Sequence, residues 1–165
     1  MNPDLLTLFD EHHLPLFRFA YRLTGSAADA EDIVQECFLA MLRPGCSYDP
    51  ARTSIRTYLF GVVRNQSLKR LRQKDWPGAQ KSPQPSPEKE ILRTELEDAV
   101  SRAVRLLPET QREVLILAHY EQMPLAEIAR VMDLEVTAVK SRLQRARAEL
   151  KETLAAYATG LERKR

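Results

Sequence analysis

The segment Pro124–Leu150, PLAEIARVMDLEVTAVKSRLQRARAEL, predicts two helices joined by a short turn. The apolar residues of the first helix recur at the spacing of one helix face, as Leu125, Ile128, Ala129 and Met132. Pro124 suits the first helical position, where its missing N–H needs no partner. The apolar pattern breaks at Asp133 and Leu134 and resumes with a new phase, as Val136, Val139, Leu143, Ala146 and Leu150.

The outward face of the second helix carries groups suited to DNA, namely Thr137, Lys140, Ser141, Gln144 and Arg145, with Arg142 and Arg147 on its flanks. Hydroxyl and amide groups bind base edges, whereas guanidinium and ammonium groups bind bases and phosphates. The segment therefore predicts a helix-turn-helix whose second helix enters a DNA major groove. An αα-hairpin with a solvated basic face is the alternative, and this segment alone does not decide between the two.

The composition of the 165-residue chain is that of a globular protein with one ordinary domain or two small ones. No apolar run approaches the roughly 20 residues of a membrane-spanning helix, so we expect no membrane insertion. The N-terminal stretch MNPDLLTLFDEHH lacks the features of a signal peptide, so we expect a cytoplasmic location. Two cysteines, Cys37 and Cys46, do not make a disulfide framework.

Charge is distributed unevenly along the chain although the net charge is only +2. Residues 1–43 hold seven acids against three arginines, a net charge of −4. Residues 52–74 hold seven bases and no acid, and residues 133–165 have a net charge of +3. An acidic surface followed by two basic ones indicates nucleic acid at two places and a different partner at the first.

All segments with a clear periodicity are helical, so we expect an all-α fold of two helical domains. The expected helices cover about residues 5–9, 16–23, 27–43, 54–74, 87–106, 109–120, 125–132 and 136–150. Pro15 separates the first two or opens the second, Gly25 ends the second, and Ser26 with Asp29 forms a capping box for the next. We expect burial of Ile55, Leu59 and Val62 in the third long helix, and of Ile91, Leu92, Leu96, Ala99, Val100, Ala103 and Leu107 in the following one.

A proline-rich segment separates the two predicted domains. Residues 75–90 read DWPGAQKSPQPSPEKE, with four prolines, a composition that does not pack as a regular element. We therefore expect a domain at 1–75, a flexible linker at 76–90, and a second domain at 91–165 that contains the helix-turn-helix.

Several stretches taken together and in this order carry a resemblance: Asp29–Glu36 (DAEDIVQE), Tyr58–Asn65 (YLFGVVRN), Leu107-Pro108, Gln111–Val114 (QREV), Glu127–Ala129 (EIA), Val139–Arg142 (VKSR) and Arg145–Arg147 (RAR). They resemble bacterial sigma factors of the sigma-70 superfamily, and within it the small extracytoplasmic-function (ECF) group. The resemblance covers nearly the whole chain. It implies a subunit that joins core RNA polymerase, directs it to promoters and initiates transcription, with no active site of its own.

The resemblance also implies roles for three sets of residues. Binding to the clamp helices of the largest polymerase subunit falls to Asp29, Asp32, Gln35 and Glu36. Melting and reading of the minus-ten element falls to Arg56, Tyr58, Arg64, Asn65, Arg70 and Arg72, with Tyr58 and Asn65 around a flipped base. Reading of the minus-thirty-five element falls to Thr137, Lys140, Ser141, Gln144, Arg145 and Arg147. An anti-sigma factor is a further expected partner.

Two residues depart from the family pattern. Tyr58 stands where the family usually has Trp, which leaves a smaller stacking side chain, and Lys69 stands where it usually has an acid. Lys69 either changes how its helix is held or adds a phosphate contact. The resemblance also implies that the loop near Arg43–Arg52 is the variable part that selects the promoter sequence, so the promoter itself is not predicted.

Two other classes of function are alternatives. The first is a stand-alone helix-turn-helix regulator, whose N-terminal half binds a signal or dimerises and whose operator is a palindrome. The second is an enzyme or metalloprotein, suggested by His12, His13 and His119 with the two cysteines. None of these shows the paired spacing of a zinc site, so we expect no metal, no cofactor and no catalytic residue.

Overall fold

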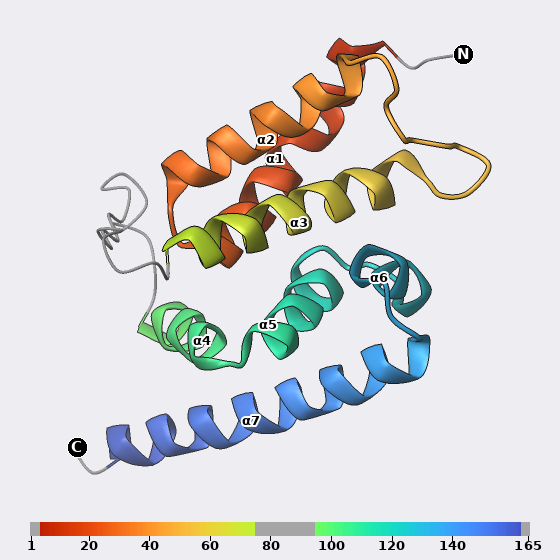
Figure 1. The fold of residues 1–165 in the computed structure, drawn as a ribbon. Coiled ribbons are helices and arrows are strands. Elements are labelled where there is room, and N and C mark those ends of the chain that lie inside the picture. Colours follow the sequence, from red (N-terminus) through yellow and green to blue (C-terminus); the bar gives the residue numbers. More distant parts are fainter. Residues whose placement is uncertain (1–3, 75–94, 163–165) are drawn as a thin grey trace. The chain divides into compact units, whose positions relative to one another are not determined.

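The computed structural model describes residues 4–74 and 95–162, and the regular structure in these ranges is helical throughout (Figure 1). The helices divide into two compact units. The N-terminal unit holds α1 (Leu5–Thr24), α2 (Ala27–Leu42) and α3 (Ile55–Lys74). The C-terminal unit holds α4 (Glu95–Leu106), α5 (Glu109–Leu115), the π-helix η2 (Ile116–Tyr120), residues 125–129 of α6 (Leu125–Met132) and α7 (Val136–Glu162). The all-α prediction is confirmed, and the predicted linker lies outside the described residues.

The core of the N-terminal unit forms where α1 packs against α2 and α3. Aromatic rings connect the three helices, because Phe19 of α1 lies 5.2 Å from Phe60 of α3 and Phe9 of α1 lies 5.1 Å from Phe38 of α2, measured between ring centroids. Such ring pairs add about 0.5–1.5 kcal/mol beyond the burial of their apolar area. Cys37 is fully buried in this core, as expected for a small apolar side chain.

Helix α1 is continuous through Pro15, so the predicted division into two helices is wrong. Proline inside a helix costs about 3 kcal/mol because it removes one backbone hydrogen bond and crowds the preceding turn. The buried face of α1 extends across this position, with Leu8 before Pro15 and Leu16 directly after it. Burial of about 1.5–3 kcal/mol for each such leucine offsets the local cost.

The corner between α1 and α2 follows the prediction. Gly25 adopts φ 71° and donates its N–H to the carbonyl of Tyr21 at 2.8 Å, which closes α1. The Ser26 hydroxyl accepts the N–H of Asp29 at 3.2 Å, as an N-cap does. The reciprocal half of the capping box differs, because the N–H of Ser26 donates to the Thr24 hydroxyl and not to Asp29.

Helix α3 begins after Ser54, whose hydroxyl accepts the N–H of Thr57 at 3.2 Å. Its buried face contains Leu59, Phe60 and Val63, whereas Val62 is only half-buried. The prediction of Val62 as a core residue was therefore one position out of phase. Ile55 is also half-buried, because it lies in the first turn of the helix.

In the C-terminal unit α7 packs against α4 and α5. The core positions predicted from helical spacing are buried at Ala99, Ala103, Leu107, Val139, Leu143 and Ala146. Leu96 and Val136 are 64% and 41% exposed, so their predicted burial is wrong. Both lie in the first turn of a helix, and the buried face of each helix begins one turn later.

The helix-turn-helix has a tight turn between α6 and α7. Asp133 adopts φ 54°, and the N–H of Leu134 donates to the carbonyl of Ala129 at 2.8 Å. This bond, one residue longer than an α-helical one, is the closing bond of a Schellman motif and satisfies a carbonyl at the end of α6. The turn ends α6 and starts α7 in a new direction, as the break in the apolar pattern predicted.

Replacement of Gly25 with alanine is expected to destabilise the N-terminal unit by about 1–2 kcal/mol, because a Cβ disfavours the left-handed conformation. No heavy atom lies within 4 Å of the added Cβ, so the cost is conformational and not steric. Amide hydrogen exchange in α1 and α2 measures it. Gly160→Ala, inside α7 with an equally open Cβ position, is the control and should not reduce protection; an unchanged exchange rate in Gly25→Ala would contradict the assignment.

Candidate functional site

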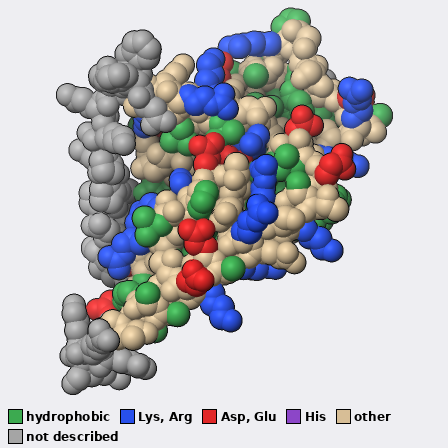
Figure 2. All heavy atoms as spheres, turned by 60° about the horizontal axis from the view of Figure 1, so that its bottom comes forward, with side chains coloured by type: hydrophobic (Ala, Val, Ile, Leu, Met, Phe, Trp, Pro, Cys, Tyr) green, Lys and Arg blue, Asp and Glu red, His purple; other side chains and the backbone are tan. Residues whose placement is uncertain are grey.

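The polar face of α7 is exposed at every position predicted for DNA: Thr137, Lys140, Ser141, Gln144, Arg145 and Arg147. The opposite face is anchored by Val139, Leu143 and Ala146, which are buried. Figure 2 brings the α7 side of the C-terminal unit forward and shows basic side chains among acidic and uncharged ones. Hydroxyl, amide and guanidinium groups on one solvent-facing side of a helix are the groups that read base edges.

Arg147 differs from the other residues of this face because it has a partner in η2. Its Nε donates to Nε2 of His119 at 3.2 Å, which holds the side chain against the π-helix. A neutral imidazole leaves the charge of the guanidinium uncompensated, and the two terminal nitrogens remain available to an anion. This geometry suits a phosphate contact better than a base contact.

The acidic face of α2 divides into exposed and paired residues. Asp32, Gln35 and Glu36 are exposed, and Glu36 forms a 3.1 Å ion pair with Arg43 at the end of the helix. The Asp29 side chain is only 14% exposed. The Asp29 carboxylate, which the resemblance assigns to polymerase binding together with these three residues, is therefore largely buried.

Asp29 instead connects α2 to the end of α3. Its Oδ1 accepts a 2.8 Å hydrogen bond from Arg70, and its Oδ2 pairs with Lys74. Burial alone would raise the pKa of Asp29, but hydrogen bonds and charge from Lys74 and Arg70 outweigh it and lower the pKa below 3.8. Arg70 also lies 3.7 Å from Asp32. One residue expected to bind polymerase and one expected to bind DNA thus bind each other.

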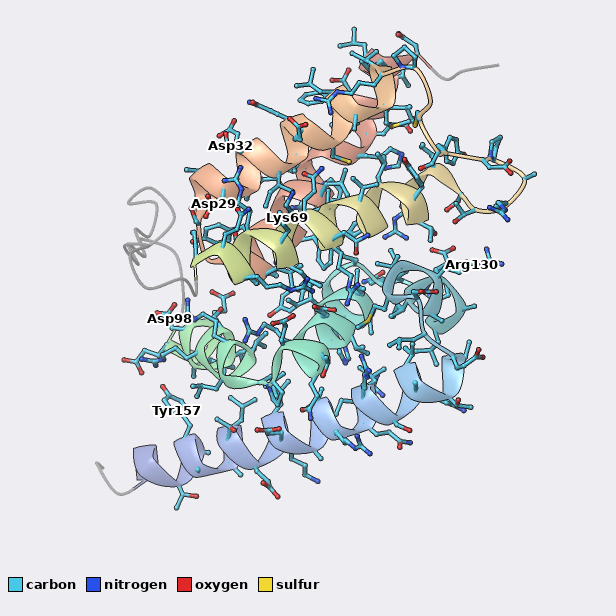
Figure 3. The ribbon with its side chains drawn as sticks, viewed as in Figure 1. Asp29, Asp32, Lys69, Asp98, Arg130 and Tyr157 are labelled. Atoms are coloured by element: carbon cyan, nitrogen blue, oxygen red, sulfur yellow. The ribbon has the colours of Figure 1, made fainter. Side chains whose placement is uncertain are left out.

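A groove runs between α2 and α3 beside this cluster. Its lining residues are Asp32, Ile33, Gln35, Glu36 and Leu39 from α2, and Gln66, Lys69, Arg70 and Gln73 from α3. Figure 3 shows Asp29 and Asp32 on the α2 side and Lys69 on the α3 side. Lys69, which replaces the family's usual acid, therefore adds a positive charge opposite the carboxylates of α2.

The face of α3 expected to contact the minus-ten element brings together three of the predicted residues. Tyr58, Asn65 and Arg72 recur at intervals of seven residues, two helical turns, so they share one side of the helix. Asn65 and Arg72 are exposed. The Arg56 guanidinium lies 5.5 Å from the centre of the Phe60 ring, a cation–π contact.

The Tyr58 side chain is less available for stacking on a base than an aromatic side chain without such contacts would be. Its hydroxyl lies 3.3 Å from the Ser47 hydroxyl and 3.7 Å from the Cys46 sulfur, and its ring centroid lies 5.2 Å from that of Tyr48. We call these four residues the Tyr58 cluster. Sequence reasoning missed it, because helical spacing carries no information about which loop residues fold back on α3.

No group of three or more metal-ligating side chains occurs in the described ranges. Within these residues, no helix has both the length and the apolar character needed to cross a membrane.

Comparison with known proteins identifies the family. The model for Sigma-70 region 2 matches residues 8–77, and the model for Sigma-70, region 4 matches residues 97–150. The ECF RNA polymerase sigma factor SigL of Mycobacterium tuberculosis (strain ATCC 25618 / H37Rv) is 34% identical over 154 residues, which are 89% of this chain and 86% of SigL. The chain belongs to the ECF RNA polymerase sigma factors. ECF sigma factor SigW of Bacillus subtilis (strain 168) is 26% identical over 155 residues, 84% of this chain and 82% of SigW.

Solved structures share the fold of this sigma factor. CnrH in complex with the cytosolic domain of CnrY has a TM-score of 0.69 at 25% identity, over 92% of this chain and 88% of that one. RpoE in complex with the anti-sigma factor NepR from Bartonella quintana has a TM-score of 0.72 at 24% identity, over 90% and 95% of the two chains. The region 2 match covers nearly all of α1 to α3, and the region 4 match covers the helix-turn-helix.

As an ECF sigma factor, the protein functions with core RNA polymerase to initiate transcription at promoters. The exposed polar faces of α2, α3 and α7 are therefore surfaces of a transcription initiation factor.

Asp29→Asn is expected to destabilise the N-terminal unit of the sigma factor by about 1–2 kcal/mol at neutral pH, because it weakens two ion pairs whose partners Arg70 and Lys74 are partly screened by solvent. Because the folded-state pKa of Asp29 lies below 3.8, the wild-type advantage is complete above pH 3.8 and is lost as pH falls through the lower folded-state value. Urea denaturation of both proteins from pH 7 to pH 2 measures the difference.

Asp32→Asn is the matched control for this measurement. Its side chain is 61% exposed and 3.7 Å from Arg70, so the same change should cost only a few tenths of a kcal/mol. Equal losses in the two variants, or a difference for Asp29→Asn that does not depend on pH, would contradict the role of the Asp29 ion pairs.

Proposed function

We propose that this sigma factor binds core RNA polymerase through α2, contacts the minus-ten element through α3 and the α2–α3 loop (residues 43–54), and contacts the minus-thirty-five element through α7. The observation that carries the proposal is the occurrence of both sigma regions in one chain, each with an exposed polar face of suitable chemistry. The proposed place of action is the cytoplasm, where core polymerase and promoter DNA are found.

The polymerase contact centres on Asp32, Gln35 and Glu36. These side chains are exposed along α2 and border the groove between α2 and α3, so they can pair with basic and amide groups on the clamp helices of the largest subunit. Asp29 is assigned an indirect role, because its ion pairs with α3 leave little of its carboxylate accessible. It fixes the start of α2 relative to the helix that would contact DNA.

The minus-ten contact centres on Asn65, with Arg64 and Arg72 beside it on α3. Asn65 is exposed and offers an amide that can bind the edge of a flipped base, and the arginines supply charge for phosphates. Arg70 takes part mainly through its bond with Asp29, which holds the end of α3. Tyr58 and Arg56 belong to the same helix but have contacts with the α2–α3 loop and with Phe60, respectively.

The minus-thirty-five contact divides between bases and phosphates. Lys140, Ser141, Gln144 and Arg145 are assigned to base edges, and Thr137 and Arg147 to phosphates. The Ser141 hydroxyl donates to the Thr137 carbonyl at 3.1 Å, so it offers its acceptor side outward. The bond of Arg147 with His119 supports its assignment to the backbone.

An anti-sigma factor is the proposed regulator. The structurally similar CnrH is seen with the cytosolic domain of CnrY, and RpoE of Bartonella quintana with the anti-sigma factor NepR. A partner that covers the α2 face would compete with core polymerase for Asp32, Gln35 and Glu36. Added in increasing amounts, it should therefore displace this sigma factor from core polymerase.

Transcription reconstituted from core polymerase and this protein tests the proposed function, with transcript starts read by sequencing. Wild-type protein should direct starts to specific sites. Asp32→Lys should weaken polymerase binding about ten-fold or more, because it reverses the charge at the centre of the proposed contact. Glu31→Lys, the same charge change on a different side of α2, is the control and should have a smaller effect. Binding of promoter DNA without specific starts would favour a stand-alone regulator.

Arg145→Ala is expected to relax sequence preference at the minus-thirty-five element, with a loss of about 1–3 kcal/mol of discrimination at one base pair. Arg72→Ala should instead weaken binding of all promoters alike and lower the salt slope by about one. Binding of polymerase holoenzyme to cognate and scrambled promoters at several salt concentrations separates the two effects. Equal effects of both variants on both DNAs would remove the base-reading role of Arg145.

A further inference from the structure

Three consecutive residues of the α2–α3 loop contact one side chain of α3. Cys46 and Ser47 approach the Tyr58 hydroxyl at 3.7 and 3.3 Å, and the Tyr48 ring packs on the Tyr58 ring at 5.2 Å with an interplanar angle of 50°. These contacts span only 10 to 12 positions of sequence, but they join a loop to the second turn of a helix.

The two ends of the loop are held by turns of their own. At one end Gly45 adopts φ 85° and the N–H of Cys46 donates to the carbonyl of Arg43 at 3.3 Å. At the other, Asp49 accepts the N–H of Ala51 on its side chain at 2.9 Å and the N–H of Arg52 on its carbonyl at 3.0 Å. Between them, the backbone of Ser47 and Tyr48 forms no hydrogen bond to a helix in the described part of the chain. The conformation of residues 46–48 therefore depends on Tyr58.

The anchored part of the loop lies on the same side of α3 as the proposed minus-ten contact. Tyr58 and Asn65 are seven residues apart, which places them on one helix face at a separation of about 10 Å along the axis. A base bound at Asn65 would therefore lie on the same face of α3 as the loop residues that contact Tyr58.

We propose that Tyr58 is a positioning residue for promoter selectivity: its hydroxyl and ring hold residues 46–48 in one conformation on the face of α3 that carries Asn65, and this conformation sets which base the minus-ten contact accepts. The proposal rests on the proposed function of α3 and adds to it the residue that determines specificity through the loop.

The chemistry of tyrosine suits this role. A phenol both donates and accepts, so it can bind the Ser47 hydroxyl and the Cys46 thiol at once, whereas the indole of tryptophan donates only. Burial is the main cause that raises the pKa of Tyr58 above 10.0, and the nearby Cys46 adds to it, so the hydroxyl keeps its proton at neutral pH. The tyrosine that stands in place of the family's usual tryptophan therefore has two hydrogen-bonding partners in the loop, Cys46 and Ser47.

The first experiment measures the loop in the isolated full-length protein. Tyr58→Phe keeps the ring and its contact with Tyr48 but removes both hydrogen bonds, so amide exchange of residues 43–54 should accelerate roughly 2- to 10-fold. Tyr21→Phe is the matched control, because it removes the same hydroxyl from a tyrosine whose ring stacks on Phe17 of α1. Unchanged exchange in Tyr58→Phe would overturn the proposal without reference to polymerase.

The second experiment measures selectivity with reconstituted polymerase on promoters randomised in the minus-ten element. Tyr58→Phe should flatten the base preference at one or more positions several-fold, and Cys46→Ala with Ser47→Ala should produce the same change. All three substitutions together should add nothing further, since they remove the same contacts. Cys46→Ser, which keeps a hydrogen-bonding group, should retain the wild-type preference.

The possible outcomes distinguish failure of the specificity role of Tyr58 from failure of the proposed function. Faster loop exchange with unchanged base preference would overturn the specificity role and leave the proposed function intact. Additive effects of Tyr58→Phe and the loop substitutions would also overturn it. Absence of specific starts with the wild-type protein would overturn the proposed function and the specificity role together, while exchange would still report whether Tyr58 holds the loop.

Discussion

The ion pairs of Asp29 with Arg70 and Lys74 are the constraint on which the arrangement of the N-terminal unit depends. They join the first turn of α2 to the last turns of α3, so they restrain the helix proposed to bind polymerase relative to the helix proposed to bind DNA. The pairing has an additional effect on charge. It neutralises part of the basic end of α3, which leaves Asn65 and Arg72, on another side of the helix, as the more accessible DNA-facing residues.

The contacts of the two units differ in kind. In the N-terminal unit, ion pairs between Asp29 and the end of α3 add to the apolar packing of α1, α2 and α3, and they lie beside a groove lined mainly by charged and amide side chains. In the C-terminal unit, apolar packing positions α7, since Val139, Leu143 and Ala146 are buried and every candidate DNA contact lies on the opposite face. The helix-turn-helix can therefore vary its exposed residues without change to its core.

Features that depend on neighbouring residues were predicted well from the sequence. The glycine closure at Gly25, the N-cap at Ser26 and the exposed face of α7 follow from local conformation and helical period. Prediction failed at Pro15, where a local cost is offset by burial that only the assembled core provides. It also failed for Asp29, whose partner Arg70 lies 41 positions away, because periodicity indicates which face a residue occupies but not what it meets. The Tyr58 cluster was missed for the same reason.

The π-helical turn η2 has a consequence for insertions and deletions in this part of the chain. A π-turn accommodates one residue more than the α-helical path it interrupts, and it here carries His119 toward Arg147 of α7. Removal of a single residue between Ile116 and Tyr120 would turn the residues that follow it in this helix by about 100° about the helix axis, and it would move His119 away from Arg147. The orientation of one exposed arginine of α7 thus depends on the length of a helix that lies outside the helix-turn-helix.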